Sequence, residues 1–432
     1  MTLNSLLGFN HQTMKLKTEI VAGLTTFFTL SYILAVNPTI LSSTGMDKPA
    51  VFTATAIASA IATLLIALMA KLPFAQAPSM GLNAFFAFTI CQAMGFTWQQ
   101  ALAALLVEGI IFIIITFFNV REMILNSIPQ NLRYAISVGI GMFIAFIGLK
   151  NAGIVVADSA TFVKLGEFTP TALLGIIAIL ISAILMARQV KGSLFIGIVA
   201  ATAIGIPMGV TQIPQGWVPF SAPCSLEPVM CQFDFSAFAD FRMVAVVFSL
   251  LLVNIFDTVG TLVGLADKAG ITRPDGTIPR VREAMMSDAI GTTCSALLGS
   301  STITTYIESA SGIAEGGRSG MTALTVAVLF VASLFLAPVF LLIPGAATSG
   351  ALVMVGVLMI GAVKKMELGD ITEVFPAFVT MLGMVLCYSI ADGISLGIIS
   401  FVVLKLFTGR RCELSPILIV LALLFIVNFI VA

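Results

Sequence analysis

The chain has 432 residues, of which 59% are hydrophobic and only 10% are charged. A soluble globular protein carries about 25% charged residues, and the 21 Lys and Arg with 21 Asp and Glu of this chain cannot cover a water-exposed surface of its size. The composition therefore excludes a soluble protein and predicts an all-α polytopic protein embedded in a lipid bilayer. Its net charge of zero gives no indication of a nucleic-acid partner.

Apolar stretches recur along the chain at lengths near the roughly 20 residues that a membrane-spanning helix needs. Uninterrupted spans are predicted at about 20–41, 51–70, 98–118, 132–149, 170–187, 193–210, 241–265, 322–343, 347–363, 371–390 and 393–408. Short or discontinuous spans, interrupted by Gly, Pro, Ser or Thr, are predicted at about 73–94, 284–300 and 302–318. Together they make about fourteen spans. The apolar tail at 415–431 is a further span, a re-entrant piece or an interfacial helix.

The cationic residues separate onto two sides when the predicted connections are assigned alternately to the two faces of the membrane. With the N-terminus inside, the outside connections hold only Lys48, Lys150, Lys164 and Arg242. Cationic connections remain in the cytoplasm. We therefore expect a multi-pass protein of the cell (inner or plasma) membrane with a cytoplasmic N-terminus.

The longest outside connection divides the chain into two halves. It is rich in proline and contains Cys224 and Cys231, the one pair of cysteines whose position allows a bridge. We interpret 1–210 as a first repeat with spans 1–7, 211–240 as an external linker, and 241–432 as a second repeat with spans 8–14 and the apolar tail. An odd number of spans in each half forces the two repeats into inverted orientations.

The third predicted span of each half is interrupted, at 73–94 and at 302–318. Paired interruptions at matched positions indicate the binding site of a transporter. In the second segment, a β-branched and aromatic run is typical of a strand, and the nine residues from Glu308 to Gly316 would give about 14 Å of helix, half a bilayer. In the first segment, an extended piece from Pro78 to Leu82 is expected to precede a half-helix that begins near Asn83.

Three carboxylates fall inside predicted spans: Asp257, Glu308 and Glu108. A charge at membrane depth is costly unless it is paired or hydrated, so each of them is a functional candidate. Asp257 and Glu308 lie beside polar, glycine-rich segments, whereas Glu108 is equally well explained as a buried helix contact. The aromatic residues Phe85 and Phe86 follow the first interruption directly.

Three motifs together resemble one family of transporters. They are PFAQAPSMGLNAFFAF at 73–88, FDTVGTLVG at 256–264 and STITTYIESASGIAEGGRSG at 301–320. The combination is similar to the AzgA-like branch of the nucleobase:cation symporter-2 family, the purine permeases for hypoxanthine, guanine and adenine. The resemblance implies two inverted seven-span repeats, a core and a gate domain, and short strands in spans 3 and 10.

The resemblance also implies a set of site residues. Asp257 is expected to hydrogen-bond the purine ring, and Glu308 to bind the base and, with Asp257, to take part in proton coupling. The family's pocket maps onto Tyr306 and Ile307 of the strand and onto Asn83, Phe85 and Phe86 of span 3. Thr261 occupies the place where related uracil permeases carry a histidine, and His11 is the sole histidine of this chain. Neither a cofactor nor a metal is expected.

The expected function is proton-coupled import of a purine nucleobase, with hypoxanthine or guanine favoured, bound at the midplane between spans 3, 8 and 10. A purine offers ring donors and acceptors that carboxylates and backbone amides can match, and an aromatic side chain can stack on it. The open alternatives are an adenine or other nucleobase permease, sodium coupling, and an anion carrier or channel of a related fold. An enzyme is not expected, because the chain has no HExxH, GxGD or Ser–His pattern. A homodimer is expected from the fold.

Overall fold

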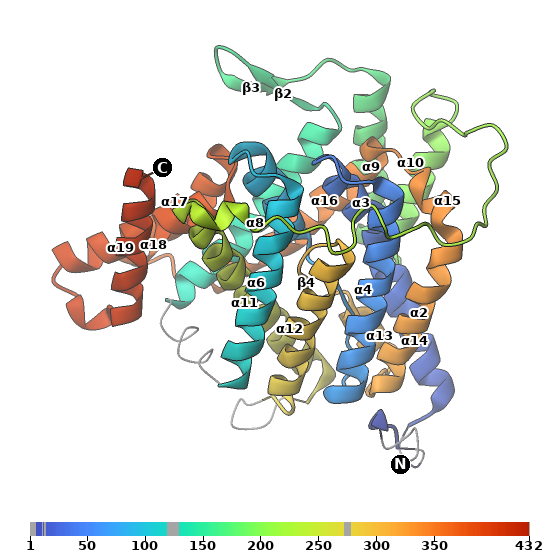
Figure 1. The fold of residues 1–432 in the computed structure, drawn as a ribbon, viewed down its shortest axis with the longest axis horizontal. Helices are drawn as coiled ribbons and strands as arrows, with labels where there is room; N and C mark the ends of the chain where they lie inside the picture. Colours follow the sequence, from blue (N-terminus) through green and yellow to red (C-terminus); the bar gives the residue numbers. More distant parts are fainter. Residues whose placement is uncertain (1–5, 11, 13, 119–128, 272–277, 432) are drawn as a thin grey trace.

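Helices make up most of the computed structural model, which describes residues 6–10, 12, 14–118, 129–271 and 278–431. Up to residue 205 the elements are α2 (Leu16–Leu30), α3 (Ile33–Ser42), α4 (Lys48–Met69), β1 (Gln76–Pro78), α5 (Met80–Ala84), the π-helix η1 (Phe85–Ala93), α6 (Trp98–Phe117), α8 (Gln130–Asn151), β2 (Val155–Asp158), β3 (Phe162–Leu165), α9 (Pro170–Ala187) and α10 (Ser193–Gly205). The remaining elements are η2 (Ser236–Ala239), α11 (Phe241–Ala269), α12 (Val281–Leu298), β4 (Ile303–Thr305), α13 (Ser309–Ala314), α14 (Gly320–Ser333), η3 (Leu334–Leu336), α15 (Ala337–Leu341), α16 (Gly345–Met359), η4 (Ile360–Lys365), α17 (Ile371–Leu386), α18 (Ile390–Phe407), η5 (Arg411–Glu413) and α19 (Pro416–Val431). Figure 1 shows their arrangement.

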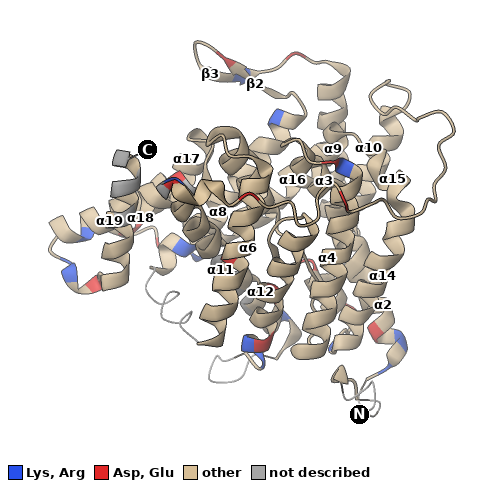
Figure 2. Cartoon of the chain, in the orientation of Figure 1, with Lys and Arg blue, Asp and Glu red and all other residues tan. Residues whose placement is uncertain are grey.

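Seven helical stretches of the described chain are long and apolar enough to cross a membrane. They are Leu16–Ser42, Lys48–Met69, Trp98–Phe117, Gln130–Asn151, Pro170–Ala187, Gly320–Leu341 and Gly345–Lys365. The helices α10 and α17, the α5–η1 segment and part of α11 are apolar but shorter. Charged residues lie mostly at helix ends and in connections (Figure 2). These features confirm a helical membrane protein, while the count of about fourteen spans stays a prediction.

The contacts between helices recur in the two halves of the chain. The pairs α4–α14, α9–α16 and α9–α10 correspond to α12–α6, α17–α8 and α17–α18 when each element is replaced by its counterpart seven predicted spans away. Three further contacts join an element to its own counterpart: α4–α12, α8–α16 and the antiparallel strands β1–β4. This exchange of equivalent elements is the pattern expected of two inverted repeats.

The same contacts divide the helices into two groups. We call the elements α2 to α6 and α11 to α14, with their strands, the core domain; α8 to α10 and α16 to α18 form the gate domain. The C-terminal α19 packs on α18 and α11 through a face that includes Leu418, Leu421 and Phe425. Most of the dense packing lies within each domain, as a two-body transporter requires.

A few polar and aromatic side chains join the two domains. Lys191, which precedes α10, forms an ion pair with Glu315 at the end of α13. Tyr388, between α17 and α18 of the gate, packs its ring edge-on against Phe88 of η1 at a centroid distance of 5.9 Å. Relative motion of the core and gate domains must rearrange both contacts.

The segment at 284–300, predicted to be a short or discontinuous span, is the short helix α12 of 18 residues, and the expected interruption was wrong, because α12 runs unbroken from Val281 to Leu298. Its small residues serve close helix packing instead. A Cβ atom added at Gly291 would lie 2.8 Å from the Cβ of Ala62 on α4, and one added at Gly109 on α6 would lie 2.6 Å from the Thr293 hydroxyl of α12.

The two interrupted segments do contain short strands and short helices, with shifted boundaries. In the first, the strand ends at Pro78 and α5 already begins at Met80, so the expected extended piece to Leu82 was placed too late. Ser79 is the N-cap of α5 and has an extended backbone, with a ψ of 128°. The backbone N–H of Asn83 donates to the Ser79 carbonyl over 2.8 Å, which closes the first turn of the helix. In the second, α13 is six residues long, with Glu308 at its N-cap.

The long connection between α10 and η2 is attached to core elements along its course. Its backbone amides at Ser221, Cys231 and Asp234 donate to carbonyls of η3, α12 and α6 over 3.1, 2.8 and 3.3 Å. It crosses the front of the molecule toward η2 (Figure 1). Cys224 and Cys231 are both free thiols.

Candidate functional site

The strands β1 and β4 form a two-stranded ribbon inside the core domain. Gln76 lies opposite Thr305 in the antiparallel register, and the Ser79 amide extends the pairing by donating to the Thr302 carbonyl over 2.9 Å. All six strand residues are buried. Because each strand satisfies the other's backbone groups, extended chain is tolerated within a helical membrane protein.

Alternating side chains of the ribbon face two different carboxyl groups. Thr304 faces Asp257 of α11, whereas the Thr305 hydroxyl donates to Asp288 of α12 over 3.0 Å. Gln76 shares the face of Thr305 and donates through Nε2 to the same Asp288 carboxyl. The period of two in a strand therefore places one acidic residue on each side of the ribbon.

The Asp257 carboxyl lies where β1 passes into α5. The Ser79 hydroxyl donates to its Oδ2 over 2.7 Å, and Asp257 is half-buried. Ser79 is the residue at which the chain changes from strand to helix. The structure thus brings the predicted acid of α11 against the interruption of the first repeat.

The Glu308 carboxyl lies at the corresponding place in the second repeat, at the N-cap of α13. Its Oε1 accepts a hydrogen bond of 2.6 Å from the hydroxyl of Tyr32, which lies between α2 and α3. Glu308 is also half-buried. Each predicted acid of the site is therefore held by a neutral hydroxyl donor.

Tyr306 connects the two acidic positions. Its hydroxyl donates to the Pro78 carbonyl over 2.5 Å, so its ring crosses from the end of β4 to the end of β1. The neighbouring Ile307 is 48% exposed, in contrast to the 6% exposure of Tyr306. The structure therefore brings together Asp257, Glu308 and Tyr306, with Ile307 open beside them.

The remaining predicted residues of span 3 are deeply buried. The Asn83 Oδ1 accepts from the Ser301 hydroxyl, and among the described residues its Nδ2 has no hydrogen-bond partner. Phe85 and Phe86, the first residues of η1, have no exposed surface and belong to the apolar core. Asn83 thus offers an unused donor, whereas neither phenylalanine ring is open in this conformation.

Glu108 is a buried residue that contacts a neighbouring helix. Its Oε1 accepts from Asn254 Nδ2 over 2.8 Å, which ties α6 to α11 one turn before Asp257. Thr261, one turn after Asp257, is half-buried. His11 lies outside the described residues.

Three buried residues were missed by sequence reasoning: Asp288, Tyr32 and Glu19. Asp288 was detectable as a carboxylate within an apolar segment, but the surrounding small residues suggested a break. Tyr32 carried no comparable signal, because one tyrosine in an apolar helix is ordinary. The Glu19 carboxylate accepts from the Thr322 hydroxyl over 2.5 Å and from the Arg318 amide over 3.0 Å, which fixes the start of α14.

Replacing Asp288 with Ala is expected to destabilise the ribbon. The Gln76 and Thr305 side chains would lose a buried acceptor, at a cost of about 1–3 kcal/mol for each donor left unpaired. The thermal unfolding temperature of the purified protein in detergent should fall by several degrees. Asp288→Asn keeps an acceptor oxygen, so its unfolding temperature should fall less. Equal unfolding temperatures of Asp288→Ala and wild type would show that Asp288 does not stabilise the ribbon.

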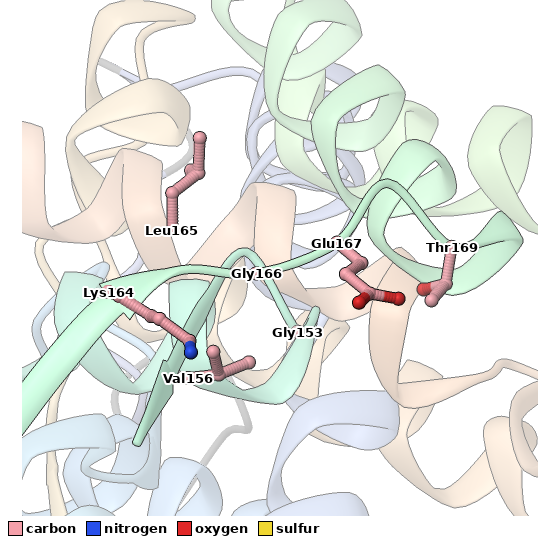
Figure 3. Close-up of a pocket in the computed structure, with 7 residues that line it drawn as sticks. All are labelled: Gly153, Val156, Lys164, Leu165, Gly166, Glu167 and Thr169. Carbon is pink, nitrogen blue, oxygen red and sulfur yellow. The ribbon is translucent and has the colours of Figure 1, made fainter. Parts of the chain in front are cut away.

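A surface hollow of about 370 Å³ lies beside the β2–β3 hairpin and contains none of the predicted site residues. Val156, Lys164, Glu167 and Thr169 are among the residues that line it (Figure 3). Lys164 lies 2.8 Å from Asp158, and this hydrogen bond, with backbone donors at Ala160 and Thr161, lowers the pKa of Asp158 to about 2.

The sequence of this chain matches a family model over most of its length. Residues 17–396 match the model Xan_ur_permease, described as Permease family. The chain belongs to this permease family. The family is the nucleobase:cation symporter-2 family that the three motifs resemble, and its members are transporters rather than enzymes.

Named relatives are similar to this permease from end to end. Guanine/hypoxanthine permease PbuO of Bacillus subtilis (strain 168) is 45% identical over 425 residues, which cover 96% of this chain and 98% of PbuO. Adenine permease AdeP of Escherichia coli (strain K12) is 43% identical over 415 residues, covering 96% of this chain and 93% of AdeP.

Among solved structures, the transmembrane domain of the cyanobacterium bicarbonate transporter BicA has the same fold. The TM-score is 0.66 at 16% sequence identity, covering 89% of this chain and 97% of that chain. The murine anion transporter Slc26a9 in its inward-facing state also gives 0.66, at 13% identity over 94% of this chain and 71% of that chain. These likenesses confirm the inverted-repeat fold and carry no information on the substrate of this permease.

Proposed function

We propose that this permease imports purine nucleobases, with hypoxanthine or guanine preferred, by proton symport. The observation that carries the proposal is the placement of Asp257 and Glu308 at the two strand-to-helix junctions of one buried ribbon, with Tyr306 between them. The names of the relatives PbuO and AdeP support a purine as the solute.

The chemistry of this cluster suits a neutral heterocycle. A purine presents ring N–H donors and ring nitrogen or carbonyl acceptors along its edges. The carboxyl groups of Asp257 and Glu308 can accept the ring N–H, and Asn83 Nδ2 offers a donor that the described protein leaves unused. Two acidic residues disfavour an anionic solute by like-charge repulsion.

Coupling to protons follows from the position of Glu308. A carboxyl that binds a proton together with the base, and releases both on the cytoplasmic side, links uptake to the proton gradient. Asp257 would take part in the same exchange. Sodium is the alternative coupling ion, because carboxylates bind either cation.

Alternating access would use the two bodies described above. The ribbon and both acids lie in the core domain, so a rocking motion of core against gate would carry the bound purine across the membrane as one unit. The paired elements also support the assignment of 1–210 and 241–432 as the two repeats, with 211–240 as the linker. We further propose a homodimer.

Uptake of radiolabelled hypoxanthine by cells that express this permease tests the function. Unlabelled hypoxanthine and guanine should compete strongly, whereas adenine, xanthine and uracil should compete less. Strong competition by adenine alone would favour an adenine permease. If the cells took up no purine but transported bicarbonate or sulfate, the proposed purine substrate would be disproved and an anion carrier would be favoured.

The cytoplasmic N-terminus can be tested with cysteines of the chain itself. Cys231 and Cys412 are both exposed, and the proposed orientation places Cys231 outside and Cys412 inside. In single-cysteine variants, a membrane-impermeant maleimide should label Cys231 in intact cells and Cys412 only after permeabilisation. The reverse labelling pattern would invert the topology.

A further inference from the structure

Tyr32 is a buried tyrosine at a break in the first membrane helix. It lies between the end of α2 and the start of α3 and has 1% of its surface exposed. Its hydroxyl donates to Glu308 Oε1 over 2.6 Å, across 276 positions of sequence. Its ring centroid lies 6.5 Å from that of Tyr306. Tyr32 thus contacts the site of Asp257 and Glu308 from the α2–α3 junction, which lies outside the three sequence motifs at 73–88, 256–264 and 301–320.

The groups around Glu308 make the Tyr32 hydrogen bond important for its carboxyl. The titratable groups that face its carboxyl are Tyr32 from the α2–α3 junction, Tyr306 from the end of β4 and Asp257 from α11. In the described part of the chain, no Lys or Arg lies within ion-pair distance of Glu308. A carboxylate in a protein interior needs a donor or a counter-charge. The Tyr32 hydroxyl supplies that donor.

The Tyr32–Glu308 pair lies entirely within the core domain. The helix α2 packs against α13, the helix that Glu308 caps, and a Cβ atom added at Gly312 of α13 would lie 2.1 Å from the Thr26 hydroxyl of α2. Such close contact fixes the two elements relative to each other. Because both residues belong to the core domain, motion of the gate should leave the Tyr32–Glu308 hydrogen bond intact. Protonation of Glu308 and binding of the substrate are then the events that can change this hydrogen bond.

We propose that Tyr32 is a positioning residue that holds the Glu308 carboxylate and sets the pH range over which it exchanges its proton. This inference rests on the proposed proton symport. A hydroxyl that donates to a carboxylate stabilises the ionised form and leaves the protonated form less favoured. The Tyr32 hydroxyl keeps Glu308 Oε1 hydrogen-bonded and thereby favours loss of the Glu308 proton.

The test is the pH dependence of hypoxanthine uptake into proteoliposomes by Tyr32→Phe. Without the hydroxyl, Glu308 should keep its proton to higher pH, so the alkaline limb of the uptake profile should move up by about one pH unit or more. On the acidic side, where the carboxyl is protonated in both proteins, the rates should be equal. Tyr134→Phe is the matched control, since the Tyr134 hydroxyl accepts a hydrogen bond from Gln130 Nε2 at an exposed site, and its profile should equal that of wild type.

The outcomes separate the two proposals. If wild type transports hypoxanthine with proton influx and Tyr32→Phe has the same pH profile, the role of Tyr32 is disproved while the symport stands. A uniform loss of rate at every pH, in a variant that elutes and melts like wild type, would also overturn it. If wild type moves no protons with the base, the symport itself fails. Should Tyr32→Phe fail to assemble, Tyr32→Leu, which also lacks the donor, gives the same comparison.

Discussion

Replacing Glu308 with Gln is expected to abolish accumulation of hypoxanthine against its gradient. The amide keeps an oxygen that can accept from the Tyr32 hydroxyl, so the ribbon and α13 should remain folded. It cannot take up and release a proton, so purine entry would no longer draw on the proton gradient. The initial rate of uptake should fall by at least about tenfold, equivalent to about 1.4 kcal/mol.

The measurement is uptake into proteoliposomes with and without an imposed pH gradient. Counterflow exchange of labelled against unlabelled hypoxanthine should survive better than net uptake, because exchange needs no net proton release. Glu367→Gln is the matched control: Glu367 is exposed and should have wild-type uptake. Gradient-driven accumulation by Glu308→Gln at the wild-type level would exclude Glu308 as the coupling residue.

Replacing Gly356 with Val is expected to prevent stable assembly of the gate domain. A Cβ atom at this position of α16 would lie 2.4 Å from the carbonyl oxygen of Gly141 on α8 and 2.8 Å from the Cβ of Ala145. The first of these is a backbone atom and cannot rotate away. Overpacking costs about 1–3 kcal/mol where side chains can adjust, and a backbone clash between two helices lies at or above that range.

Fluorescence-detected gel filtration of tagged variants measures this effect. Gly356→Val should give a small or absent monodisperse peak and, where a peak remains, a lower melting temperature. Gly361→Val is the matched control, since a Cβ atom at Gly361 meets nothing within 4 Å. A Gly356→Val protein as stable as wild type would show that the α8–α16 contact is not as tight as the structure has it.

Local sequence chemistry predicts those features that depend on neighbouring residues. The run of β-branched residues around Thr304 predicts a strand, and the small residues after Glu308 predict a short helix, which the structure confirms. The same reasoning failed for 284–300. Small residues also occur where two helices pack closely, and composition alone does not distinguish a break in a helix from a close contact between helices.

The candidate site was only partly predictable, because its contacts are long-range. Asp257 and Glu308 were found because charges are rare in apolar spans. Their donors Ser79 and Tyr32 are ordinary residues of their own segments and gain a role only through packing. Phe85 and Phe86 were chosen by position along the chain, but the direction of a side chain in η1 depends on tertiary contacts that the sequence does not state.

The ribbon of β1 and β4 also constrains how the chain is made. Gln76 and its partner Thr305 are separated by 229 positions, and a ribosome adds about 5–20 residues per second. After β1 is synthesised, about 10 to 45 s pass before its partner strand exists. We therefore expect the first repeat to wait in the insertion machinery, with its extended segment shielded from lipid, until translation of the second repeat supplies the strand that completes it.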